Sequence, residues 1–191
     1  MAPDGTEIRK IVKGMETMSY NQRSAKQQYQ NAVNNAQGHL FEDAITAGCS
    51  TYRESGRGEI NKTPEPFRVL NKGTNGMFMG RFTAHAQPDF QGTLENGRSI
   101  VFEAKTTTKD RLKRDILTVE QQTVLERHLN LGAVAAVCVS IEDKFFFIPW
   151  EIWRDMKNHY GRKYVTAEDI EKYRVKFNGS VLFLDYVHKT E

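Results

Sequence analysis

The chain has 191 residues, of which 39% are hydrophobic and 27% charged, and its formal net charge is +3. This length allows one domain with a substantial core and an appended arm. No apolar run approaches the ~20 residues of a membrane-spanning helix, and the first twenty residues lack the apolar core of a secretory signal. We therefore expect a cytoplasmic protein with no membrane partner. Cys49 and Cys138 form no CxxC pair, which argues against a structural zinc site.

The N-terminal part of the chain predicts an arm followed by a helix. Residues 1–20 show little periodicity and carry several basic side chains, so we expect a mobile basic arm. From about residue 21 an apolar stripe with helical spacing predicts a helix, which Gly48 and the segment 53–59 should end. The domain proper should then span residues 21–191, with a short Gly-rich excursion at about 69–86.

The rest of the chain alternates strand and helix signals. Thr118 is the N-cap candidate of a helix that has Gln121 at its third position and Gly132 as its stop. A buried strand at 133–141 should pair with 144–149 through a turn at Glu142-Asp143. The other expected elements are strands at 67–70, 77–83, 89–94, 98–105 and 180–187, a helix opening at Pro149, and a short helix at 167–172. This order predicts an α/β fold with one mixed central β-sheet flanked by helices.

The turn after Leu94 decides whether two acidic residues meet. A two-residue loop, 96–97, would set Asp89 opposite Ala104, and the two carboxylates would point to opposite faces of the sheet. A three-residue loop, 95–97, with Gly97 left-handed, would set Asp89 opposite Glu103. Only the second register places one coherent apolar set on one face, and burial of that face favours it. The apolar set is Phe90, Leu94, Ile100, Phe102 and Ala104; the other face carries Asp89, Gln91, Thr93, Ser99, Val101, Glu103 and Lys105.

Two readings of this acidic pair remain open. Glu103 and Lys105 could form an ion pair on a wet sheet edge. Alternatively, the repulsion between Asp89 and Glu103 could be relieved by a divalent metal, since Mg²⁺ prefers carboxylate oxygens and takes one or two of them. A bound metal can lower the pKa of water and stabilise a phosphoryl transition state. Lys105 could then hold the attacking water or neutralise the phosphate.

Several motifs carry a family resemblance in consistent order over residues 38–155. Pro88-Asp89 followed by Glu103-Ala104-Lys105 resembles the PD-(D/E)xK nuclease motif. The segments GHLFED, NKTPEP, DFQGTLENGRSIVFEAKTT and LTVEQQTVLERHLNLGAVAAVCVSI resemble the corresponding segments of RecU-type Holliday junction resolvases. The resemblance implies a restriction-endonuclease-like core and a magnesium-dependent, homodimeric endonuclease that makes paired nicks in four-way DNA junctions during recombination. Mn²⁺ should substitute for Mg²⁺, and the expected setting is a bacterial or phage-infected cell.

The resemblance also implies roles for individual residues. Asp89 and Glu103 look like metal ligands, the Ala104 carbonyl could be another, and Lys105 looks like the catalytic lysine. Glu42 resembles the family's helical acidic residue, which helps to bind metal or water, although an ordinary solvated carboxylate would look the same. Gln121 resembles a glutamine that orients water or DNA, and it also fits a capping box with Thr118; the two roles are compatible.

Basic residues near these motifs are candidate phosphate contacts, and each could equally be a solvated surface charge. No base-reading element is evident, so we expect recognition of branched shape and backbone. The candidates are Arg57, Lys62, Lys72, Arg81, Lys109, Arg111, Lys113 and Arg114, with a further group in the arm. A nuclease with another DNA target and a non-cleaving junction-binding protein are the alternative functions. Residues 145–153 could contribute to a dimer interface or to the core.

Overall fold

The structure is a computed structural model that describes residues 5–64, 67–75, 77–82 and 87–187. Before residue 27 it describes the backbone alone. The chain divides into two compact units, residues 1–39 and residues 40–191. Within the described ranges no helix combines the length and apolar character needed to cross a membrane.

Helix α1 spans Gly5–Glu54 and begins much earlier than the sequence led us to expect. The expected helix start near residue 21 was wrong, because residues 5–20 are helical as well; residues 1–4 lie outside the described residues. The mobility of this basic arm stays a prediction. Gly48 does not end this helix either. A Cβ at Gly48 would collide with the backbone carbonyl of Val181, so this glycine permits a close approach inside the second unit.

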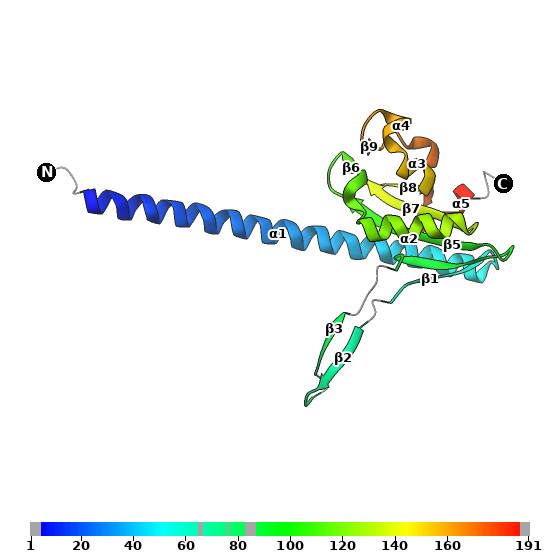
Figure 1. The fold of residues 1–191 in the computed structure, drawn as a ribbon, viewed down its shortest axis with the longest axis horizontal. Coiled ribbons are helices and arrows are strands. Elements are labelled where there is room, and N and C mark those ends of the chain that lie inside the picture. Colours follow the sequence, from blue (N-terminus) through cyan, green and yellow to red (C-terminus); the bar gives the residue numbers. More distant parts are fainter. Residues whose placement is uncertain (1–4, 65–66, 76, 83–86, 188–191) are drawn as a thin grey trace. The chain divides into compact units, whose positions relative to one another are not determined.

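A mixed five-stranded sheet forms the centre of the second unit (Figure 1), which confirms the expected fold class. Its strand order is β1-β4-β5-β7-β8. Only the β5–β7 pair is parallel, and the other neighbours are antiparallel. The strands are β1 (Gly58–Lys62), β4 (Phe90–Leu94), β5 (Ser99–Thr107), β7 (Val134–Ile141) and β8 (Lys144–Pro149). The turn between β7 and β8 has positive φ at Glu142 and Asp143, as the expected two-residue hairpin requires.

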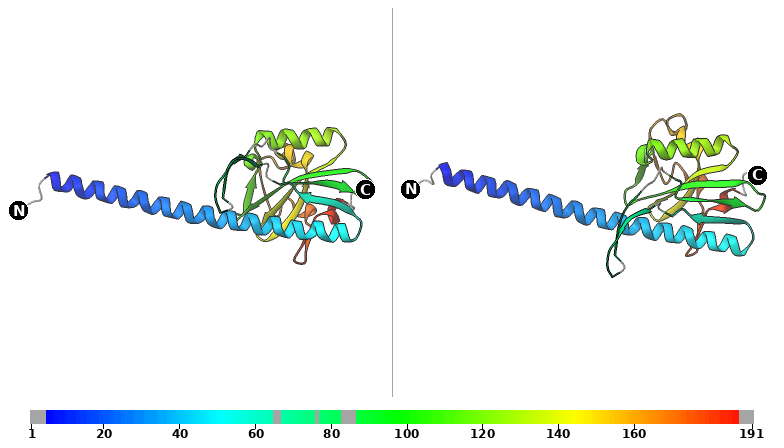
Figure 2. Two further views of the ribbon diagram at one scale, coloured as in Figure 1. Left: turned by 90° about the horizontal axis from the view of Figure 1, so that it is seen from below. Right: turned by 60° about the horizontal axis from the view of Figure 1, so that its bottom comes forward.

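Both faces of this sheet are buried (Figure 2). On one face, Phe90, Ile100 and Phe102 pack against the end of α1, whose contribution is Phe41, Ile45, Cys49 and Tyr52. On the other face, Val101, Val137 and Val139 pack with helices α2 (Val119–Asn130) and α3 (Trp150–Arg154). Residues 146–148, Trp150 and Trp153 are buried in the chain's own core, so the dimer-interface reading of this stretch is not supported.

The smaller elements depart from expectation near the C-terminus. The segment 167–172 is not an α-helix but contains part of a single 3-10 turn, η2 (Glu171–Tyr173). The expected strand at 180–187 is only β11 (Val181–Leu182), followed by the short helix α5 (Leu184–Val187). The remaining elements are β6 (Arg111–Lys113), η1 (Arg114–Ile116), α4 (Met156–Tyr160), β9 (Tyr164–Thr166) and β10 (Lys176–Phe177).

The Gly-rich excursion interrupts the hairpin formed by β1 and β4. Its strands β2 (Phe67–Lys72) and β3 (Phe78–Phe82) pair with each other and confirm the two strands expected there. Strand β1 was missed by the sequence analysis. Because Lys62 pairs with Phe90, the chain leaves and rejoins the sheet at the end where Asp89 lies.

Candidate active site

The β4–β5 hairpin has the three-residue loop that the burial argument favoured. Phe90 is opposite Phe102, and Thr93 is opposite Ser99. The Gly97 N–H donates to the Leu94 carbonyl, and Gly97 has a φ of 80°. This register places Asp89, which precedes the first residue of β4, level with Glu103 on β5.

Asp89 is fixed by backbone groups on two sides. Its carboxylate Oδ2 accepts a hydrogen bond from the Ala104 N–H at 2.9 Å. Its own carbonyl accepts from the Thr63 N–H at 2.8 Å, where the excursion begins. The side chain is 27% exposed, so it remains accessible to a ligand while its position is set by the sheet.

Glu103 lies on the central strand, and its residue exposure is 0%. Glu103 does form an ion pair with Lys105, but the pair lies on the buried central strand, so the expectation of a wet sheet edge was wrong. Burial raises the pKa of Glu103 to about 8; the charge of Lys105 opposes this rise and that of Asp89 adds to it. Its Oε1 is buried without a hydrogen-bond partner among the described residues, although a buried polar atom is costly unless it is paired.

Lys105 joins the two carboxylates. Its Nζ donates to Asp89 Oδ2 at 3.1 Å and to Glu103 Oε2 at 3.0 Å. Burial lowers the pKa of Lys105, but the two carboxylates outweigh burial and the net shift is upward. Lys105 is therefore a charged ammonium, suited to holding an anionic oxygen rather than to accepting a proton.

Gln121 makes the capping-box contact expected from the sequence and a contact with Glu103 that was not expected; its role toward water or DNA stays a prediction. Its Oε1 accepts from the Thr118 N–H at 3.1 Å, and its own N–H donates to Thr118 Oγ1 at 3.2 Å, which completes a capping box at the start of α2. Its Nε2 donates to Glu103 Oε2. The cap therefore holds the amide in the orientation that supplies Glu103 with a donor.

Glu42 belongs to a neighbouring ion pair. Its Oε2 accepts from Lys62 Nζ at 2.6 Å. The hydrogen bond to Glu42 is the main reason that the pKa of Lys62 is raised, and the charge of Asp89 adds to it. The ammonium group of Lys62 is thus close enough to interact electrostatically with both Glu42 and Asp89. Its role as the partner of Glu42 was missed from the sequence, because strand β1 was not expected.

The residues present fit a single divalent cation with few protein ligands. In the described part of the chain no group of three or more His, Cys, Asp or Glu side chains is arranged to hold a metal, and a role for Glu42 in metal binding stays a prediction. Asp89 and Glu103 supply two carboxylates, the number that Mg²⁺ typically takes. Within the described residues Glu103 Oε1 has no hydrogen-bond partner, so this oxygen is available to bind a metal.

The Ala104 carbonyl also fits this set. The N–H and C=O of one strand residue point to the same side, and the Ala104 N–H points at Asp89. On that side the β4 pairing has ended, and Pro88 has no N–H with which to bond the carbonyl.

The expected phosphate contacts are spread over the second unit. Lys62 lies at the site, whereas Arg57 lies at the opposite end of β1, over the Tyr52 ring and 3.7 Å from Asp185. Arg114 is held in the fold because its Nε donates to the Arg154 carbonyl. Lys109, Arg111 and Lys113 are exposed after β5. The side chains of Lys72 and Arg81, and those of the basic residues before residue 27, lie outside the described residues.

A stacked group beside β6 was not anticipated. The guanidinium carbons of Arg111 and Arg162 lie 5.1 Å and 4.8 Å from the centre of the Tyr164 ring. These contacts tie the basic strand β6 to its partner β9. No sequence signal brings together residues fifty positions apart in this way, because the pairing of two three-residue strands depends on the tertiary fold.

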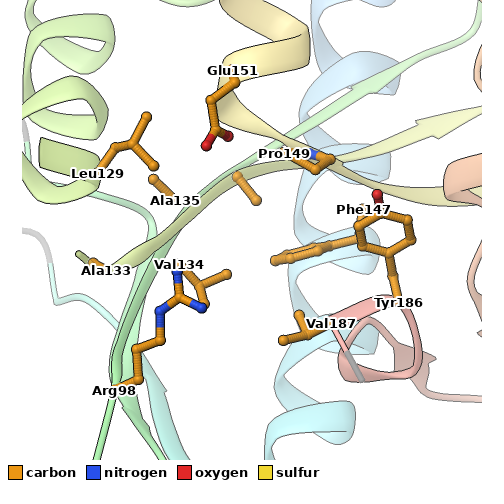
Figure 3. A pocket seen from close by; sticks show the side chains of 11 residues that line it. Arg98, Leu129, Ala133, Val134, Ala135, Phe147, Pro149, Glu151, Tyr186 and Val187 are labelled. Carbon is orange, nitrogen blue, oxygen red and sulfur yellow. The ribbon is translucent and has the colours of Figure 1, made fainter. Parts of the chain in front are cut away.

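A cavity of about 190 Å³ lies at the other end of the sheet (Figure 3). It is lined by the first residues of β7 and by Arg98, Glu151 and Tyr186. Since Val134 is opposite Ile100 and Val139 is opposite Lys105, the cavity is several residues along the strands from the acidic pair. The carboxylate site is therefore separate from this cavity.

Asp89, Glu103 and Lys105 lie together on this mixed sheet, as the PD-(D/E)xK nuclease motif requires. The chain belongs to the RecU family (Recombination protein U), whose family model matches residues 36–191. This confirms the resemblance found in the sequence, and with it the class of enzyme, an endonuclease of the Holliday junction resolvase type. No curated protein matches the chain. A solved structure that resembles it is the Holliday junction resolvase Hjc of Archaeoglobus fulgidus, at 14% identity and a TM-score of 0.40, covering 61% of this chain and 75% of that one.

Proposed function

We propose that this chain resolves four-way DNA junctions as a homodimer, by paired and magnesium-dependent nicks. The observation that carries the proposal is the buried Glu103 Oε1, which has no hydrogen-bond partner in the described part of the chain, beside an aspartate that shares a lysine with the same glutamate. A purely DNA-binding surface has no use for acidic groups next to phosphate, because they repel it. A divalent cation converts this arrangement into a site for phosphate.

Each residue then has a distinct role. Asp89, Glu103 and the Ala104 carbonyl would hold Mg²⁺, which would supply an activated water and stabilise charge on the phosphate. Lys105, kept charged by its two acidic neighbours, positions the nucleophile or a phosphate oxygen. Gln121 orients Glu103 by donating to it. Mn²⁺ should support the same chemistry, because carboxylate and water ligands suit it as well.

The second acidic group sits beside these residues. Glu42 is paired with Lys62, whose ammonium also lies in the field of Asp89. We infer that Lys62 neutralises Glu42 until substrate arrives, and that one of the two then contacts water or phosphate.

DNA should be held through its backbone. Lys109, Arg111 and Lys113 follow Lys105 within a few residues and are exposed, and we expect them to flank the scissile phosphate. Each phosphate neutralised adds about 0.9 to the slope of log affinity against log salt. A four-way junction has near two-fold symmetry, which suits a C2 dimer with two active sites.

Synthetic four-way junctions and linear duplexes, each with magnesium or with EDTA, test the proposal. Symmetric nicks in opposing junction arms are expected with magnesium only. Asp89→Asn and Lys105→Ala should each slow nicking at least about a hundredfold while junction binding persists. Lys157→Ala, an exposed lysine on α4, is the matched control and should nick normally. Cutting of linear duplex would point to another DNA target, and binding without cutting would make the protein an accessory factor.

A further inference from the structure

The first unit of the chain, residues 1–39, has no part in the site described above. The family match begins at residue 36, so most of this unit lies outside it. Its backbone is nevertheless helical from Gly5 and continues without a break into the second unit. A helix of this length needs a reason to be stable, since isolated helices in water are marginal unless an apolar face is packed.

The sequence of this helix has a seven-residue repeat. Counted from Ile8 at alternating steps of three and four over more than four heptads, eight of ten positions are apolar or small, and the other two are Gln22 and His39. These positions, a and d of the heptad, hold Ile8, Ile11, Met15, Met18, Gln22, Ala25, Tyr29, Ala32, Ala36 and His39. A period of 3.5 that persists over three or four heptads is the pattern of a left-handed coiled coil rather than of a helix on a globular core.

The charged residues avoid this seam. Between residues 7 and 39 there are seven charged side chains, and none is at position a or d. Five of them occupy the outward positions b, c and f: Arg9, Lys10, Lys13, Glu16 and Arg23. Only Glu7 and Lys26 flank the seam, at positions g and e. A helix that merely remained in solvent would have no reason to keep charge off one stripe.

From residue 27 onward, where side chains are described, the seam is uncovered in the single chain. Tyr29, at position a, is 72% exposed, and Ala32 and Ala36 are also exposed. Leu40, at the next e position, is 69% exposed. A large aromatic residue this exposed in the middle of a regular seam indicates a surface that a partner covers.

We propose that residues 8–39 form a parallel two-stranded coiled coil with a second copy of this chain. Identical helices satisfy a seven-residue seam directly, because each a and d side chain meets its own counterpart. Gln22 stands at one central a position, where a single polar pair fixes register. The basic residues at b, c and f point away from the partner helix, so the net positive charge of the segment does not oppose pairing. This contact does not depend on the chemistry of the nuclease site.

Disulfide trapping in the full chain tests the proposal without DNA or metal. Ala32→Cys places a thiol at position d, and Asn31→Cys places one at position c on the adjacent residue. Two d-position thiols in a parallel coil lie within disulfide range, whereas two c-position thiols do not. Mild oxidation should convert Ala32→Cys to a covalent dimer about ten times more completely than Asn31→Cys. The native thiols Cys49 and Cys138 are both buried and should contribute little background.

A second pair of substitutions separates the seam from simple proximity. In the Ala32→Cys background, Tyr29→Glu should abolish trapping, because it places two carboxylates in one buried layer. Gln30→Glu, which adds the same charge at position b, should not. Equal trapping at residues 31 and 32, or trapping that survives Tyr29→Glu, would overturn the proposal. The proposal would also be overturned if Ala32→Cys formed no covalent dimer and Tyr29→Glu weakened junction binding. That result would mean that the a/d face of the helix contacts DNA. Loss of nicking alone would leave the trapping result unchanged.

Discussion

Gln121 should affect both stability and catalysis, whereas Thr118 should affect stability alone. The two residues share a capping box, but only Gln121 also donates to Glu103. Thr118→Ala removes the N-cap acceptor and should cost about 1 kcal/mol of unfolding free energy. Gln121→Ala removes the reciprocal cap bond and the donor to a buried carboxyl group, and loss of that donor adds ~1–3 kcal/mol. The total loss for Gln121→Ala should therefore be ~2–4 kcal/mol.

A third substitution isolates the catalytic contact. Gln121→Glu keeps an oxygen that accepts from the Thr118 N–H, so the cap survives. It replaces the donor facing Glu103 with an acceptor, so nicking should fall at least about tenfold with little loss of the cap. Denaturant unfolding in EDTA gives the stabilities, and single-turnover nicking of a four-way junction gives the rates. The reasoning would fail if Gln121→Ala were as stable as Thr118→Ala and if Gln121→Ala and Gln121→Glu both nicked at the wild-type rate. Gln121 would then serve only as a helix cap.

Three further predictions concern proton linkage, glycine packing and phosphate contacts. Burial raises the pKa of Glu103 from 4.5 to about 8, so a metal ion must displace the proton of this carboxyl group. Calorimetry should therefore show magnesium affinity rising about tenfold per pH unit up to pH ~8. An affinity that does not change with pH would contradict this. The same raised pKa means that the metal-free protein loses stability as pH rises from 4.5 through 8, which unfolding in EDTA measures. Gly38→Ala should stabilise the protein by about 1 kcal/mol, since nothing lies within 4 Å of the added methyl. Gly48→Ala should destabilise it by at least ~2 kcal/mol, because the methyl would collide with the Val181 carbonyl. Equal unfolding midpoints for the two variants would refute both expectations. Lys113→Ala should lower the salt slope of junction binding by about 0.9, and an unchanged slope would remove Lys113 from the DNA contacts.

The register of the site hairpin could be predicted because burial allowed only one answer. A shift of one residue would have moved Phe90 and Phe102 off a shared face, at a cost of several kcal/mol of buried apolar area. The capping box was equally local, since Thr118 and Gln121 have the spacing that the motif requires. The burial of Glu103 could not be predicted in the same way. Alternation along β5 suggested one wet face, whereas α2 and α3 cover that face, so Val101 and Glu103 are both enclosed.

The misplaced elements have separate causes. Strand β1 reads GEINK, which is too short and too charged to signal a strand, and its pairing with β4 is what makes it one. The apolar run at residues 180–187 resembles a strand, but Phe183 and Leu184 are buried in the core outside any ladder. The helical start of α1 was missed because its apolar residues form a narrow seam of period 3.5, diluted by Gln22 and by several small residues, instead of a broad face.

The anchoring of Asp89 has a consequence for how nucleases of this shape can diversify. The hydrogen bond from the Thr63 N–H to the Asp89 carbonyl, 2.8 Å long, closes the base of the loop that carries β2 and β3. Asp89 is thus held at the base of this loop, whereas β2 and β3 pair with each other outside the central sheet. We therefore expect the length and charge of this loop to vary among related nucleases without moving Asp89. Substrate recognition could then change in evolution independently of the hydrolytic chemistry.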